Sequence, residues 1–207
     1  MYLPNIDALI KHSISFHWGA EVNDAPEDPG IYAWFLPNTG GPATDIGGLF
    51  ASVQKQLDQA SALTEVFGRV GTARLSFRQA VGSENWEERL PGADWPYSRS
   101  QVEEVGNLLL ALSVFSPPIY IGMAAGQGGL KQRLKQHIDG QYQVLDGDPY
   151  LGTFAARVTH IMNDPRILKK CIVGCMKITG FSNNSQLIRE IEHFLIQTLK
   201  PTQSKKG

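Results

Sequence analysis

Two polar side chains lie at the edge of one predicted helix in the second half of the chain. Arg133 and His137 are four residues apart in the segment 130–138, where apolar residues repeat at helical spacing. Residues four apart share a helix face, so both can point toward one site. Arginine offers a planar fork for phosphate oxygens, and histidine offers a nitrogen that titrates near neutral pH. An ordinary amphipathic helix with two polar edge residues would show the same spacing.

A glutamate lies on the apolar face of a second predicted helix. In the segment 187–199, Glu192 falls inside the arc formed by the apolar residues, whereas Glu190 falls on the polar side. Burial disfavours a carboxylate unless a cation or a basic side chain compensates its charge. A structural ion pair, for example with Arg133, would meet that requirement, and so would a hard divalent cation with oxygen ligands.

Two short tyrosine-containing segments provide the strands that would position these helices. Gly30-Ile31-Tyr32 follows a turn-rich segment, and Tyr120-Ile121-Gly122 precedes the helix of Arg133. In each segment the residues alternate in the way that is typical of strands. Antiparallel strands are usually joined by a hairpin loop of about two to five residues. Here residues 38–116 stand between the two segments.

The segment between the two strands has the composition of a folded insertion. Its apolar residues follow helical spacing over 49–60 and again over 102–112. Residues 38–116 are therefore expected to form a mainly helical insertion within a single domain of residues 1–207. Helical spacing also predicts a helix over residues 3–18.

Taken in order, these segments resemble the motifs of the GIY-YIG nuclease superfamily, whose members cut phosphodiester bonds in DNA with one metal ion. Residues 30–32 and 120–122 resemble the two strands that name the superfamily. The segment 130–137 resembles its arginine helix, and the segment 192–201 resembles its metal-glutamate helix with the proline that follows. The resemblance implies an α/β (α+β) fold, in which helices flank a small antiparallel sheet.

The resemblance also implies catalytic roles for particular residues of a DNA endonuclease. Glu192 would bind the metal, which is expected to be Mg²⁺ with Mn²⁺ as a substitute. Tyr32 is the first candidate for orienting or deprotonating the attacking water, and Tyr120 is the competing candidate. Arg133 would stabilise the charge that develops on the phosphate oxygens, while His137 would assist proton movement or hold Tyr32.

The charge of the chain is divided unevenly. Residues 1–117 contain 7 Lys or Arg and 14 Asp or Glu, whereas residues 118–207 contain 12 and 6. The basic half holds most of the predicted site and includes a cluster formed by Lys131, Arg133, Lys135, Arg166, Lys169 and Lys170. Such a cluster attracts phosphate groups, although a solvated charged surface has the same composition. The charge thus favours a phosphate-bearing partner, and the resemblance implies that this partner is double-stranded DNA.

No segment of the sequence predicts a membrane span or export. The sequence contains neither an apolar run long enough to cross a bilayer nor an N-terminal basic segment followed by an apolar one. A cytoplasmic protein without membrane contact is expected.

Two other functions are compatible with the same sequence. One is a catalytically degenerate nucleic-acid-binding module of the same fold, since this chain has Ser204 where many members of the superfamily have an asparagine. The other is a protein-interaction domain that uses the acidic insertion. Target specificity, biological pathway and oligomeric state have no signature in the sequence.

Overall fold

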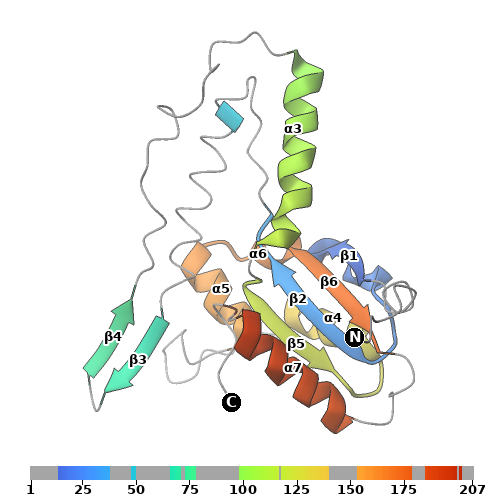
Figure 1. The fold of residues 1–207 in the computed structure, drawn as a ribbon, viewed down its shortest axis with the longest axis vertical. Coiled ribbons are helices and arrows are strands. Elements are labelled where there is room, and N and C mark those ends of the chain that lie inside the picture. Colours follow the sequence, from blue (N-terminus) through green and yellow to red (C-terminus); the bar gives the residue numbers. More distant parts are fainter. Residues whose placement is uncertain are drawn as a thin grey trace, which may run out of the picture. The chain divides into compact units, whose positions relative to one another are not determined.

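The computed structural model describes residues 14–37, 48–49, 66–70, 73–77, 98–116, 118–139, 153–178, 185–199 and 201. One compact unit consists of Met1–Leu36 with Pro117–Gly207, and a second consists of Pro37–Ser116. The elements of the first unit (Figure 1) are β1 (Ile14–Trp18), the 3₁₀ helix η1 (Gly19–Asp24), β2 (Gly30–Phe35), β5 (Tyr120–Ala124), α4 (Gly129–Asp139), α5 (Phe154–Met162), α6 (Ile167–Lys170), β6 (Ile172–Lys177) and α7 (Ser185–Leu199).

The four strands of the first unit form one antiparallel sheet in the order β1-β6-β2-β5. The predicted pairing of the two tyrosine-containing segments is confirmed, because β2 and β5 are antiparallel neighbours. In this pair Tyr32 stands opposite Gly122, and Trp34 stands opposite Tyr120. Strand β6 pairs with the other side of β2, so β5 lies at the end of the sheet order.

Helices cover both faces of this sheet. On one face, Ile188 of α7 belongs to a buried cluster with Ile31 of β2 and Ile121 of β5. On the other face, a Cβ atom added at Gly30 would lie 2.9 Å from Cδ1 of Leu130, so the missing side chain admits α4. Figure 1 shows α7 in front of the sheet and α4 behind it. The predicted α+β fold of a small antiparallel sheet flanked by helices is thus confirmed.

The end of the N-terminal segment differs from its predicted structure. Apolar spacing predicted a helix over residues 3–18, but the last residues of this range form β1, which pairs with β6. The prediction was wrong there because Ile14, Phe16 and Trp18 also alternate at strand spacing, and β6 offers backbone hydrogen bonds along its free side. Residues 3–13 lie outside the described residues.

The second unit contains both helix and strand. The spacing over 102–112 correctly predicted α3 (Arg99–Leu112), which begins with a capping box between Ser98 and Gln101. The remaining elements are the 3₁₀ helix η4 (Ser113–Phe115) and the antiparallel strands β3 (Val66–Val70) and β4 (Ala73–Phe77). The sequence did not predict this strand pair. Of the helix predicted over 49–60, the structure describes only residue 49, as helix.

No helix described in either unit combines the length and the apolar character that crossing a membrane requires.

Candidate functional site

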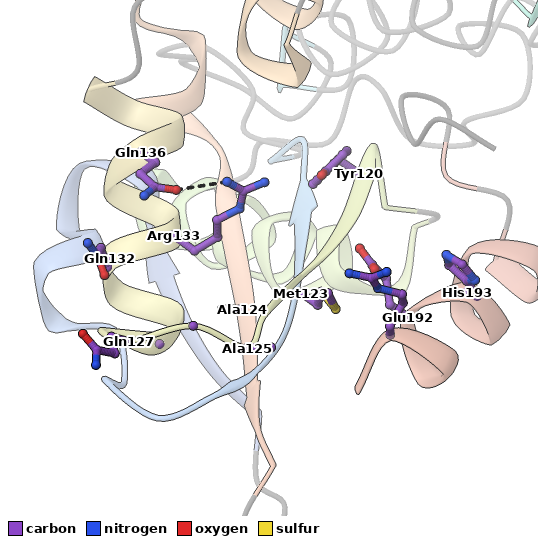
Figure 2. A pocket seen from close by; sticks show the side chains of 13 residues that line it. Tyr120, Met123, Ala124, Ala125, Gln127, Gln132, Arg133, Gln136, Glu192 and His193 are labelled. Carbon is purple, nitrogen blue, oxygen red and sulfur yellow. Dashed lines mark hydrogen bonds between the residues drawn. The ribbon is translucent and has the colours of Figure 1, made fainter. Parts of the chain in front are cut away.

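A pocket of about 540 Å³ lies along β5, between α4 and α7 (Figure 2). Because β5 ends the sheet order and the two helices cover opposite faces, side chains from both helices can meet beyond its edge. The pocket is lined by Tyr120, Met123, Ala124, Ala125, Gly126, Gln127, Gly129, Gln132, Arg133, Gln136, Arg189, Glu192 and His193. Three predicted catalytic residues, Tyr120, Arg133 and Glu192, therefore border one cavity although they are far apart in sequence.

Arg133 reaches into this pocket from α4. Its Nη1 donates a hydrogen bond of 3.0 Å to Oε1 of Gln136, one turn further along the helix. In Figure 2 the guanidinium extends from α4 toward Tyr120 on β5. The charge of Arg133 lowers the pKa of both Tyr120 and Glu192, in opposition to burial. The helix edge that holds Arg133 thus faces the other two pocket residues.

Glu192 is half-buried on the α7 side of the pocket. Burial raises the pKa of its carboxyl group, while the charges of His193, Arg189 and Arg133 and a backbone hydrogen bond from Met123 act in the opposite direction. The ion pairs among the described residues are Arg99–Glu103, Lys131–Glu27 and Lys170–Asp164. The structural ion pair of Glu192 with Arg133 is therefore not formed, and the carboxylate faces the cavity.

Tyr32 and His137 form a hydrogen-bonded pair next to this pocket. The Oη of Tyr32 lies 2.6 Å from Nε2 of His137, and the imidazole tautomer decides which group donates. Tyr32 is only 1% exposed, and burial raises the pKa of its phenol well above the usual value. Burial, followed by the charge of Arg133, lowers the pKa of His137 to about 3. Both side chains are neutral at physiological pH as a result.

Tyr120 is the tyrosine that lines the pocket. Its ring stacks on Phe154 of α5, with ring centroids 4.2 Å apart and an interplanar angle of 19°. Burial raises the pKa of Tyr120, whereas a hydrogen bond with the Tyr32 side chain lowers it. Neither Tyr32 nor His137 is among the described residues that line the cavity. Tyr120 therefore contacts the cavity directly, whereas the Tyr32–His137 pair is connected to the cavity through Tyr120.

The close approach of the two tyrosines depends on Gly122. A Cβ atom at this position would collide with Oη and Cζ of Tyr32 and would come within 2.8 Å of Cε1 of Tyr120. Any side chain at residue 122 would therefore displace one of the rings.

The described residues contain no group of three or more His, Cys, Asp or Glu side chains that could hold a metal ion. A metal in this pocket would thus rely on Glu192 as a single protein carboxylate. This fits Mg²⁺, which is often bound through one or two carboxylates with waters and substrate phosphates. A half-buried carboxylate without an ion pair is also the kind of ligand that a cation would stabilise.

The pocket includes residues that the sequence did not single out. Arg189 and His193 of α7 line it beside Glu192. Arg189 lies three residues before Glu192 and His193 one residue after it, and this closeness could have suggested that they belong to the same site. The spacing did not show which other elements of the fold lie opposite that side of the helix. Gln136 was missed for the same reason. Ser204 lies outside the described residues.

The predicted basic cluster is partly occupied by internal ion pairs. Lys131 Nζ lies 2.9 Å from Oε1 of Glu27, and Lys170 Nζ lies 2.6 Å from Oδ2 of Asp164. Arg133 is the cluster residue that lines the pocket. The positive charge available to a ligand in the pocket therefore comes from α4 and α7.

Comparisons with known proteins provide no relative from which a function could be transferred. No protein-family model, no curated protein and no solved structure matches this chain. An assignment of function must therefore start from the residues of the pocket.

Proposed function

We propose that the protein is a metal-dependent DNA endonuclease that hydrolyses phosphodiester bonds, as the GIY-YIG nucleases that its motifs resemble do. The observation that carries this proposal is the meeting of Tyr120, Arg133 and Glu192 in one pocket. The hydrogen bond between Tyr32 and His137 adds the remaining two candidates to the same region. These side chains come from four different elements, and together they supply a hydroxyl that can orient water, an anion-binding group and a carboxylate.

Hydrolysis requires that the attacking water lose a proton. Tyr120 lines the pocket, so we assign it the contact with this water in place of Tyr32. Tyr120 would orient this water, Tyr32 would hold Tyr120 in place, and the proton would pass to solvent water in the pocket. With a pKa lowered to about 3, the imidazole of His137 is too weak a base to take this proton, so its role would be to hold Tyr32 through the hydrogen bond at Nε2.

Arg133 would bind the phosphate that is attacked. Its guanidinium can donate to two non-bridging oxygens at once, and this interaction strengthens as negative charge develops in the transition state. Loss of one such donor typically slows an enzyme by about 10²–10³-fold.

Glu192 would hold Mg²⁺, which when bound supplies polarisation of the phosphate and stabilisation of the leaving oxygen. The protein offers one carboxylate, so we expect weak metal binding in the free protein and tighter binding when a substrate phosphate contributes ligands.

The proposal is tested by incubating the protein with supercoiled plasmid, linear duplex and single-stranded DNA in the presence of Mg²⁺ or Mn²⁺. Wild type should cut at least one of these substrates, whereas Glu192→Ala and Tyr32→Phe should not. The matched control is Glu190→Ala, because Glu190 is an exposed glutamate of the same helix outside the pocket lining. Its activity should equal that of wild type.

Three outcomes would count against the proposal. Equal activity in Glu192→Ala and wild type would place the chemistry elsewhere. Salt-dependent DNA binding without cleavage by any form would favour a binding module of the same fold. No DNA binding at low salt would favour a protein-interaction domain, because phosphate contacts strengthen as salt falls.

A further inference from the structure

A second arginine lines the pocket opposite Arg133. Arg189 belongs to α7 and precedes Glu192 by three residues, so the two side chains lie on adjacent turns of one helix. Arg133 belongs to α4, which forms the other wall. The cavity is thus bordered by one guanidinium on each side.

The guanidinium of Arg189 is not consumed by an internal ion pair. It takes part in none of the ion pairs among the described residues, although its charge acts on Glu192. Arg99, by comparison, is an exposed arginine that pairs with Glu103 at 3.0 Å. Arg189 therefore remains able to bind an anion that enters the pocket.

The charge of the pocket can accommodate more than one phosphate. Arg133, Arg189 and Glu192 together carry a net charge of one positive unit, and a divalent cation on Glu192 would raise it to three. A phosphodiester carries one negative charge, so a single phosphate would leave the filled pocket positive. The volume of about 540 Å³ falls within the range of about 300–1,000 Å³ that is typical of ligand sites.

We infer that Arg189 binds a backbone phosphate next to the phosphate that is hydrolysed, so that the pocket recognises consecutive phosphates of a polynucleotide. This inference rests on the proposed nuclease function and extends it to the class of substrate. Arg189 would act in binding, while Arg133 acts on the reacting phosphate.

The test is the salt dependence of duplex DNA binding, measured by fluorescence anisotropy with Ca²⁺ in place of Mg²⁺ and with the DNA checked to be intact. Each phosphate contact contributes about −0.9 to the slope of log K against log salt. Arg189→Gln should bind several-fold more weakly than wild type, with a slope shallower by about 0.9. Arg189→Lys keeps the charge and should restore most of the slope.

Arg99→Gln is the matched control, since it removes the same type of side chain from an exposed position outside the pocket. Its slope should equal that of wild type. A slope unchanged in Arg189→Gln, or reduced equally in both variants, would overturn the inference.

Cleavage by wild type separates this inference from the proposed function. A wild type that cuts DNA, with a slope independent of Arg189, would contradict the role of Arg189 alone. A wild type that binds with a slope dependent on Arg189 but never cuts would support phosphate binding by Arg189 and contradict the nuclease proposal alone.

Discussion

The imidazole of His137 is held in an environment that rejects a second proton. Its ring lies 5.6 Å from the rings of Tyr32, Tyr120 and Phe154, measured between centroids, and Arg133 adds a positive charge nearby. Since the pKa of His137 is lowered to about 3, its charge does not change over the pH range in which most enzymes work. The neutral imidazole therefore serves as a fixed hydrogen-bond partner of Tyr32.

The same shift predicts a dependence of stability on acid. In the unfolded chain His137 titrates near 6.5, so between pH 6.5 and about 3 the unfolded state binds a proton that the folded state does not. The contribution of His137 to stability is therefore fully present above pH 6.5. It is lost as the pH falls through this window, by at most about 1.4 kcal/mol per pH unit.

Urea unfolding of wild type and His137→Gln between pH 4 and 7 checks this expectation. In the variant the free energy of unfolding should depend less steeply on pH, even if lost packing lowers its value at every pH. If the free energy of unfolding depends on pH equally in the two proteins, His137 binds protons equally in the folded and unfolded states.

At the scale of elements, the β2–β5 pair determines how closely the two tyrosines approach. Gly122 stands opposite Tyr32 in the register, and there is no room for a Cβ atom between the rings. Gly126, in the loop after β5, has no atom within 4 Å of its added Cβ. A side chain at residue 122 would therefore be sterically restricted, whereas a side chain at residue 126 would not.

Gly122→Ala should lower the free energy of unfolding by about 1–3 kcal/mol, which is typical of overpacking in a core. Gly126→Ala should change it by less than about 0.5 kcal/mol. Urea midpoints of the two variants give the comparison, and equal effects would show that residue 122 is not sterically restricted.

The sequence predicted most elements that carry the site, but not all of their surroundings. Helical spacing predicted the helices of Arg133 and Glu192, and alternation predicted the two strands, because each pattern is local. The strand β1 was predicted as a helix because the pairing with β6 is a long-range contact. Arg189 was missed, since the spacing within one helix does not reveal which helix faces it across an edge strand.

The choice between the two tyrosines also could not be made from the sequence. Tyr32 and Tyr120 occupy similar positions in similar strands, but Tyr32 lies on the inner strand β2 and Tyr120 on the end strand β5. Strand order therefore decides which tyrosine lines the pocket, and this order depends on the position of β6 beside β2.

At the scale of the whole molecule, the chain leaves the sheet after β2 and returns at β5. The backbone amide of Ile119 donates to the carbonyl of Trp34 at 2.8 Å, so the two ends of the connecting segment are adjacent. A short turn could join them, as in an ordinary hairpin. The prediction that residues 38–116 are an insertion in one domain leads to a direct experiment.

Replacing residues 38–116 with a turn of about four residues should leave a protein that folds cooperatively. Urea unfolding followed by both tryptophan fluorescence and circular dichroism should give coincident transitions. Broad transitions that differ between the two probes would show that the first unit needs the second in order to fold.

We propose that the pocket between α4 and α7 hydrolyses DNA. The most direct measurement is the single-turnover cleavage rate of one labelled duplex, with its affinity measured in parallel, for wild type, Glu192→Gln and Arg133→Gln. We expect Mg²⁺-dependent cleavage by wild type, a loss of at least about 10²-fold in rate for each variant, and a much smaller loss of affinity for Glu192→Gln. Equal rates in all three proteins would place the chemistry outside this pocket.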